Sequence, residues 1–270
     1  MNPLPAITAL VVTYHTGPRL HECLYVLKGD PDISGIVIVD NGNPPAEQAW
    51  LDRFVADCPQ ARLLRNERNA GFGAAMNMAA AHASGDLLLA CNPDCVIKRG
   101  AVRLLAEALE DAPQPVIVGG RIFGIHGREE RGARRNTLTL WNAIGLGKWA
   151  LDGEPEPAGP VSVGAVSGAF FLMSRRAFEA LGGFDEGYFL HVEDVDLCRR
   201  VIEAGGVVIY QPKAGALHYT STSDAPREAV QGHKAASLKR YFRKFAKTPL
   251  EKAATPVLAP LIGLVMRLRG

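Results

Sequence analysis

The sequence predicts an α/β fold with a Rossmann-like, mostly parallel central sheet flanked by helices. Three observations lead to this class. Apolar strand-like segments alternate with helix-like segments through the first half of the chain. These apolar runs are continuous rather than alternating, as expected of strands that are covered on both faces. The chain has 270 residues, of which 47% are hydrophobic and 21% charged, enough for a well-buried core.

Strand-like and helix-like segments follow each other regularly in the first half. The strand-like segments are residues 6–15, 35–41, 61–66, 86–94 and 115–123. The first helix is expected to begin at Pro18, because proline suits a first helical turn, and to end near Leu27. Further helices are expected over residues 73–84 and 100–110.

The second half is less regular. Residues 124–160 form a long segment that starts with many arginines, contains Trp141 and Trp149, and ends rich in Pro and Gly. A segment of this length inside a compact domain is usually functional or disordered. The elements expected after it are a strand-like segment over 161–174, a short helix, a final strand over 207–212 and a polar loop over 216–224.

Residues 227–270 differ in charge from the rest of the chain. They hold ten Lys and Arg and two Asp and Glu, a net charge of +8, whereas residues 1–226 carry −6. Four apolar side chains fall on one face of a predicted helix: Leu238, Tyr241, Phe242 and Phe245. We expect a C-terminal amphipathic helical tail that binds an anionic membrane surface, although a helix docked on the protein would show the same pattern.

The cysteines and the N-terminus indicate a cytosolic chain. The five cysteines are odd in number and include no CxxC pair, which is typical of reduced thiols. The N-terminus lacks the basic segment of a signal peptide. No apolar run reaches the ~20 residues that a membrane-spanning helix needs. We therefore expect a cytoplasmic protein that meets a membrane only at its surface.

Polar residues follow three of the predicted strands, at the point where each strand ends. They are Thr13, Tyr14 and His15 after the first strand, Asp40 and Asn41 after the second, and Asn92 and Asp94 after the fourth. The carboxyl ends of parallel strands meet at one edge of a sheet, and such sheets bind ligands there. The sequence therefore predicts a ligand site at this edge.

Three features near this edge have both a structural and a functional interpretation. NAGFGAAMN, residues 69–77, is a glycine-rich turn that matches neither a Walker A loop nor the dinucleotide-binding fingerprint. Asp94 in CNPDC lies either in a simple turn or on Mg²⁺ or Mn²⁺ that also contacts a diphosphate. His218 is either a surface residue or a ligand. Cys91 and Cys95 lack the second pair of residues that a zinc site needs.

The stretch FLHVEDVDLCRR, residues 189–200, places Glu193, Asp194 and Asp196 at the start of a predicted helix. Acids in a first helical turn interact favourably with the helix dipole, so all three have a structural interpretation. The functional interpretation is that a carboxylate here acts as a general base. Asp196 is expected only to cap the helix.

Taken together and in order, these motifs resemble those of family 2 glycosyltransferases of the GT-A fold, and most closely rhamnosyltransferase-type members. The resemblance covers about residues 5–245 and is carried by VVTYHTG, VDNGN, NAGFGAAMN, NPDC, GAFFLMSRRAFEALGGFDEGYFLHVEDVDLCRR and His218. It implies a catalytic domain over residues 1–226, with a nucleotide-binding half (1–120) and an acceptor-binding half (121–226). It also implies inversion at the anomeric carbon of the transferred sugar.

The resemblance also assigns roles to residues. The positions that match nucleotide-sugar contacts are Thr13, Tyr14, Asp40, Asn69, Gly71, Phe72, Asn77, Asn92 and Asp94. Asn92 and Asp94 stand at the DxD motif, whose first Asp is absent in this chain. A divalent metal, Mg²⁺ or Mn²⁺, is expected on Asp94 and His218. Asp194 matches the general base, and Glu193 stands beside it in the ED motif.

The implied reaction moves a sugar, with L-rhamnose the best match, from a dTDP or UDP sugar to a hydroxyl of a glycan or polyprenyl-diphosphate-linked acceptor. Such a reaction serves cell-envelope polysaccharide biosynthesis on the cytoplasmic face of the inner membrane and involves no nucleic acid. Two alternatives stay open. One is a sugar-1-phosphate nucleotidyltransferase, and the other is a transferase-like membrane scaffold without activity, suggested by the incomplete DxD motif.

Overall fold

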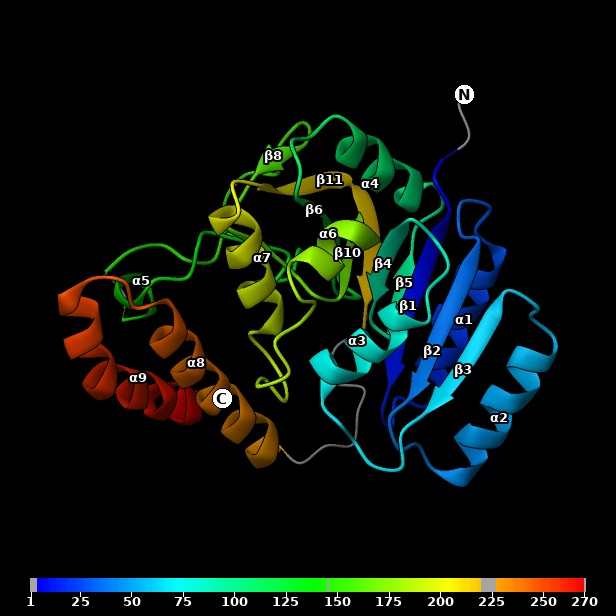
Figure 1. The fold of residues 1–270 in the computed structure, drawn as a ribbon, viewed down its shortest axis with the longest axis horizontal. Coiled ribbons are helices and arrows are strands. Elements are labelled where there is room, and N and C mark those ends of the chain that lie inside the picture. The colour runs from blue at the N-terminus through cyan, green and yellow to red at the C-terminus, as the bar shows by residue number, and fades with distance from the viewer. Residues whose placement is uncertain (1–3, 145, 220–226, 270) are drawn as a thin grey trace.

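The computed structural model describes residues 4–144, 146–219 and 227–269 and has a central sheet flanked by helices (Figure 1). In this part of the chain the sheet contains nine strands, in the order β3-β2-β1-β4-β10-β6-β11-β5, with β8 paired to β11. Its strands are β1 (Ile7–Thr13), β2 (Gly35–Asp40), β3 (Ala61–Arg65), β4 (Leu87–Cys91), β5 (Cys95–Ile97), β6 (Val116–Phe123), β8 (Val161–Ser162), β10 (Phe170–Ser174) and β11 (Val207–His218). A small separate sheet pairs β7 (Arg134–Arg135) with β9 (Ala165–Val166).

The helices include two that the sequence patterns did not predict. They are α1 (Pro18–Gly29), α2 (Pro45–Ala56), α3 (Phe72–Ala81), α4 (Ala101–Glu110), α5 (Leu140–Ala143), α6 (Arg175–Ala180), α7 (Glu193–Glu203), α8 (Arg227–Phe245) and α9 (Pro249–Arg269). The unpredicted helices are the short α5 and the longer α2, although a proline in the first turn of α2 and its buried pair Leu51 and Phe54 are typical of a helix.

The predicted α/β sheet is confirmed. Strands β3, β2, β1 and β4 run parallel to one another. Strands β6 and β11 are also parallel to each other, whereas β10 runs antiparallel between β4 and β6. Every residue of β1, β2 and β4 is buried, which explains why these strands have continuous apolar sequences.

Strand β11 is longer than the sequence predicts. Its pairing with β6 is irregular between Gln211 and Gly215 and then resumes as far as Leu217. Its last residue, His218, pairs with Cys95 of β5. The polar loop predicted over 216–224 is therefore wrong for residues 216–218, while residues 220–224 lie outside the described residues. His218 is consequently fixed at a strand end rather than carried by a loop.

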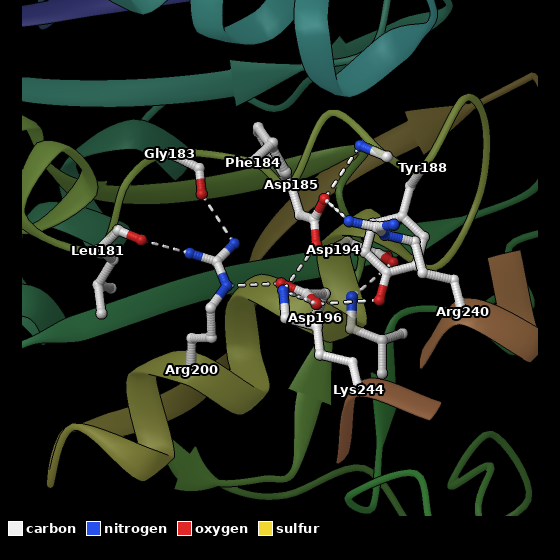
Figure 2. A network of polar contacts seen from close by, with 12 residues as sticks. Leu181, Gly183, Phe184, Asp185, Tyr188, Asp194, Asp196, Arg200, Arg240 and Lys244 are labelled. Atoms are coloured by element: carbon white, nitrogen blue, oxygen red, sulfur yellow. Dashed lines mark hydrogen bonds and ion pairs between the residues drawn. The ribbon is translucent and has the colours of Figure 1, made fainter. Parts of the chain in front are cut away.

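A network of ion pairs centred on the buried Asp196 connects helix α8 to α7 (Figure 2). The carboxylate of Asp196 pairs with Arg200 at 2.5 Å and with Lys244 of α8 at 2.7 Å, and it accepts a hydrogen bond from the Tyr188 hydroxyl at 3.0 Å. Lys244 also pairs with Asp185 at 2.7 Å. The prediction that Asp196 only caps a helix is therefore wrong, because its side chain makes no capping bond and holds α8 instead.

The apolar face of α8 meets the protein. Leu238, Tyr241 and Phe242 are buried, and the Tyr241 hydroxyl donates to the carbonyl of Leu138 at 3.2 Å. The docked helix that the sequence left open as an alternative is thus present in α8, and this face is covered. Helix α9 lies alongside α8 (Figure 1) and, among its described side chains, exposes two large apolar ones. These are Leu250 and Val257.

None of the helices in the described ranges combines the length and the apolar character that crossing a bilayer requires.

Replacing Asp196 by Asn should lower the free energy of unfolding by about 3 kcal/mol, because Arg200 and Lys244 lose the buried carboxylate that neutralises them. Urea denaturation would measure the change. The matched control is Arg243→Ala, an exposed cation of the same helix, which should shift the free energy by less than about 0.5 kcal/mol. Unfolding curves that coincide for Asp196→Asn and the unmodified protein would contradict the role of this network.

Candidate active site

Asp194 lies in the first turn of α7, and three donors hold its carboxylate. Oδ2 accepts hydrogen bonds from Arg135 at 2.8 Å and from the backbone N–H of Gly168 at 3.0 Å, and Oδ1 accepts from the N–H of Val195 at 2.8 Å. Burial raises the pKa of Asp194, but the charge of Arg135 and these hydrogen bonds outweigh burial and lower the pKa below its ordinary value. The side chain is still 15% exposed. Asp194 is therefore an ionised carboxylate that a ligand can reach.

Gly168 and Ala169 connect Asp194 to the turn that follows β4. A Cβ at Gly168 would lie 3.1 Å from the Cβ of Asp194, so a glycine allows this close approach. The carbonyl of Ala169 accepts a hydrogen bond from the N–H of Asn92 at 2.9 Å. Two consecutive residues thus contact the ED motif on one side and the Asn92–Asp94 turn on the other. The structure brings together two motifs that are far apart in the sequence.

The chain enters α7 through a strained turn. His191 and Val192 have backbone φ angles of 67° and 75°. This left-handed region is uncommon for residues other than glycine, and each such residue costs roughly 1–3 kcal/mol. Such strain persists only where surrounding contacts impose it, and it is frequent at functional sites. One of these contacts comes from α8, where the Ser237 hydroxyl donates to the Leu190 carbonyl at 3.0 Å.

Glu193 differs from Asp194 in its protonation state. It is buried, and its Oε2 has no hydrogen-bond partner among the described residues. Burial and the neighbouring charge of Asp194 raise the pKa of Glu193 to about 8. At neutral pH Glu193 therefore carries a proton while Asp194 is ionised. The two acids of the motif can act as a hydrogen-bond donor and as a proton acceptor, respectively.

The NAGFGAAMN turn packs against the residues that precede Glu193. Gly71 has a φ of 89°, and a Cβ there would lie 2.7 Å from the carbonyl oxygen of Phe189. The N–H of Phe72 donates to the same carbonyl at 3.0 Å. Only glycine fits at position 71, because both the backbone conformation and the available space exclude a side chain. The turn therefore lies next to the strained entry into α7.

Two asparagines of this motif use their side chains to hold the protein together. Asn69 accepts hydrogen bonds from the side chain of Asn41 at 2.8 Å and from the N–H of Gly71 at 2.9 Å. Asn77 donates to the carbonyl of Phe184 at 2.9 Å and accepts from its N–H at 2.8 Å. Asn69 thus shapes the turn, and Asn77 fixes α3 to the segment that leads to the ED motif.

Thr13 and Asp40 lie opposite each other at the ends of β1 and β2. Thr13 is completely buried, and its carbonyl accepts the N–H of Asn41 at 2.9 Å, so it orders the loop. Asp40 accepts the N–H of Asn43 through Oδ1 at 2.8 Å. Its Oδ2 lies 3.6 Å from the Arg65 guanidinium and has no hydrogen bond from any described residue. That oxygen is buried, whereas the neighbouring ring of Tyr14 is half-buried and partly accessible to a ligand.

Asp94 and His218 meet at the ends of β4 and β11. Nε2 of His218 lies 3.2 Å from Oδ1 of Asp94 and 3.3 Å from Nδ2 of Asn92. Its Nδ1 lies 3.0 Å from each carboxylate oxygen of Glu130. Burial lowers the pKa of His218, but the carboxylates of Asp94 and Glu130 outweigh it and raise the pKa to about 10. Two carboxylates thus surround one imidazole and favour a positive charge at this point.

This arrangement fits a divalent cation. A carboxylate oxygen and an imidazole nitrogen converge, and a second carboxylate on Nδ1 directs Nε2 towards the ligand, as in many metal sites. Across the described ranges, no set of three or more His, Cys, Asp or Glu side chains is arranged to hold a metal ion. Two protein ligands are sufficient for Mg²⁺ or Mn²⁺ when substrate phosphates and water complete the coordination. Asp94 and His218 are the residues that would hold the ion.

Three residues of the site were not predicted. Arg135 and Glu130 belong to the long segment 124–160, where arginines and acids alternate and no spacing distinguishes these two. Gly168 precedes the apolar strand β10, and an isolated glycine before a strand is a common feature. The signal for all three lies in their contacts, which join segments that are distant in the sequence.

Comparison with known proteins gives consistent results. A family model described as glycosyl transferase family 2 matches residues 8–182. The N-acetylglucosaminyl-diphospho-decaprenol L-rhamnosyltransferase of Mycobacterium tuberculosis is 30% identical over an alignment of 257 residues, covering 84% of this chain and 81% of its own length. The pre-mycofactocin glycosyltransferase of the same organism is 32% identical over 238 residues, covering 86% of this chain and 47% of its own.

Two solved structures share the fold at 17% identity. The structure of GalNAc-T7 with UDP, GalNAc and Mn²⁺ superimposes with a TM-score of 0.68 over 90% of this chain, which spans 48% of the GalNAc-T7 chain. The mannosyltransferase of Pyrobaculum calidifontis in complex with GDP-Man and Mn²⁺ has a TM-score of 0.65 over 98% of this chain and 75% of its own. The family model, the rhamnosyltransferase relative and the shared architecture confirm the resemblance carried by the sequence motifs. This chain belongs to glycosyltransferase family 2 and has the GT-A fold.

Proposed function

We propose that this glycosyltransferase inverts the anomeric centre of a sugar, with L-rhamnose as first candidate, as it moves it from a nucleoside-diphosphate sugar to a lipid-linked acceptor. The similarity to an L-rhamnosyltransferase named for a diphospho-decaprenol acceptor supports the sugar and the acceptor class. The observation that carries the mechanism is the ionised, reachable Asp194 carboxylate, joined through Gly168 and Ala169 to the Asn92–Asp94 turn.

Asp194 acts as the general base in this proposal. An acceptor hydroxyl is a poor nucleophile, and a positioned carboxylate removes its proton as attack proceeds. Attack from the face opposite the leaving diphosphate inverts the anomeric carbon. Arg135 fixes the carboxylate and keeps it ionised, which weakens it as a base but ensures that it is free of a proton before the reaction. Arg135 is thus a positioning residue for Asp194.

Glu193 supports the same step as a neutral acid. Its raised pKa keeps a proton on the carboxyl group at neutral pH, so it can donate a hydrogen bond to a hydroxyl of the acceptor or of the transferred sugar. A neutral Glu193 also leaves Asp194 as the one negatively charged carboxylate of the pair. The proton of the attacking hydroxyl therefore has a single destination.

The sugar donor occupies the carboxyl edge of β1, β2 and β4 in this proposal. Tyr14 and the carboxylate of Asp40 contact the nucleoside, and the turn at Gly71 covers the nucleotide and sugar. Asp94 and His218 hold Mg²⁺ or Mn²⁺, with Glu130 orienting the imidazole. When bound, the cation neutralises the negative charge that develops on the departing diphosphate. In this proposal the contacts around Asp40 determine whether the donor nucleotide is dTDP or UDP.

A lipid-linked acceptor would explain why the C-terminal helix α9 could bind a membrane surface. Exposed Leu250 and Val257 on α9, together with exposed Lys252, combine apolar and cationic side chains, a composition suited to an anionic membrane surface. We therefore place the protein at the cytoplasmic face of the inner membrane, as a peripheral enzyme of cell-envelope polysaccharide biosynthesis. Family membership disfavours the nucleotidyltransferase alternative.

Asp194→Asn should reduce sugar transfer about a thousandfold, the typical contribution of a general base, while nucleotide binding and folding are retained. The measurement is turnover with a panel of dTDP and UDP sugars and a lipid-linked acceptor extract. Asp111→Asn, an exposed acid at the end of α4, is the matched control and should be unaffected. Turnover of Asp194→Asn within a few-fold of the unmodified enzyme would exclude it as the base.

Transfer activity should decline above about pH 8, because Glu193 loses its proton there and can no longer donate a hydrogen bond. The sign follows from the raised pKa: the neutral form is present below about pH 8 and the charged form above it. In Glu193→Gln the side chain is neutral at every pH, so the alkaline decline should disappear. An identical decline in both proteins would assign that ionisation to another group.

Removal of Asp94 or His218 by substitution with Ala should weaken Mn²⁺ binding by more than about tenfold, and Glu130→Gln should weaken it by about tenfold through the imidazole. Electron paramagnetic resonance of Mn²⁺ with bound dTDP, UDP or GDP measures this without turnover. Glu110→Gln, an exposed acid of α4, is the control. A protein that binds none of these nucleotides would instead support the inactive scaffold.

A further inference from the structure

Lys234 lies in the N-terminal half of α8, in a part of the helix that contacts the strained entry into α7. Residues one and three positions away fix this turn of the helix: the ring of His233 stacks on Phe189 at 4.3 Å, and the Ser237 hydroxyl donates to the Leu190 carbonyl at 3.0 Å. Lys234 precedes Leu238 and Tyr241 at helical spacing, so it continues the face of α8 that packs on the protein. Its side chain is accordingly half-buried rather than exposed.

Lys234 has no counter-charge in the part of the chain that the structure describes. It makes no ion pair with any described residue, whereas Lys244, which lies further along the same helix, pairs with Asp196. Burial lowers the pKa of Lys234, and the charges of Arg131 and Arg135 lower it further. A bound anion would reverse both effects, because it favours the charged ammonium group.

The region around Lys234 has an excess of positive charge next to the catalytic base. In the described part of the chain, Arg131, Arg135 and Lys234 share this region with Asp194, the acid that pairs with Arg135. Glu193, the other acid here, is protonated at neutral pH. The carboxylates of Asp94 and Glu130 already surround His218 at the strand-end site, so the excess charge near Lys234 belongs to a different subsite.

We propose that Lys234 and Arg131 bind the diphosphate of the lipid-linked acceptor, a role that rests on the proposed transferase function. An acceptor sugar bound between them and Asp194 presents its hydroxyl to the base and its anomeric diphosphate to α8. In this proposal the protein has two separate diphosphate subsites: one for the donor near Asp94 and one for the acceptor near Lys234. Ammonium and guanidinium groups are the usual partners of phosphate oxygens.

The position of α8 adds a reason for this assignment. The helix runs from Lys234 towards Lys244 and on to α9, where Leu250 and Val257 are exposed. A polyprenyl chain attached to a diphosphate at Lys234 would meet exposed apolar side chains on α9, beyond the covered apolar face of α8. The donor diphosphate carries a nucleoside instead, which needs the strand ends of β1 and β2.

The test is binding of decyl diphosphate, a probe that carries the lipid diphosphate and no sugar, measured by calorimetry. Nucleoside diphosphate and Mn²⁺ are present at saturation, so that the donor site is filled. Lys234→Ala should weaken binding of the probe about tenfold, as expected for loss of one charge-assisted contact. Lys234→Arg keeps the charge and should bind nearly as well as the unmodified protein, as should Lys239→Ala, an exposed cation of the same helix.

Three results would overturn the assignment: no binding of the probe by the unmodified protein, equal binding by Lys234→Ala, or weaker nucleotide binding by Lys234→Ala in parallel. A second arm uses turnover. Lys234→Ala should raise KM for a diphosphate-linked acceptor but not for a neutral glycoside of the same sugar. If the proposed transferase function itself is wrong, the unmodified protein will transfer no sugar from any donor. The binding comparison does not depend on turnover and can still be interpreted in that case.

Discussion

The hydrogen bonds on either side of the peptide between Gly168 and Ala169 hold the site together. One joins the N–H of Gly168 to Asp194, and the other joins the carbonyl of Ala169 to Asn92. The turn after β4 and the first turn of α7 thereby share one short piece of backbone, continuous with β10 in the middle of the sheet. The proposed donor and acceptor subsites are consequently fixed relative to each other by a central strand of the sheet, which suits a reaction between two bound molecules.

Much of the half that we propose to bind the donor follows from the sequence. The strands β1, β2 and β4 are buried on both faces, so their sequences are continuously apolar and the polar residues at their ends are conspicuous. Short-range rules therefore place Thr13, Asp40 and Asn92 at one edge. These rules do not show whether a polar side chain contacts a ligand or another part of the protein. Thr13 and Asn77 satisfy neighbouring backbone groups, whereas one oxygen of Asp40 is left without a hydrogen bond from the described residues.

The acceptor half depends on contacts that no local pattern specifies. Arg135 and Glu130 come from an irregular segment, and each acts on a residue more than fifty positions away. Asp196 has the sequence context of a helix start, yet it is completely buried because Lys244 reaches it from α8. The apolar stripe of α8 was equally compatible with lipid and with protein, since both environments select the same residue types. Only the fold distinguishes these cases.

The late position of α8 in the chain has a consequence for biosynthesis. During translation the parallel strands β1 to β4 leave the ribosome first, and their order allows them to pair without later segments. One contact that supports the turn at His191 and Val192 comes from Ser237 of α8, a helix that Lys244 anchors and that is made late. The three donors that hold the carboxylate of Asp194 all precede α8, so a nascent chain can hold this carboxylate before α8 exists. The order of synthesis leaves the strained turn without its contact from Ser237 until α8 is in place.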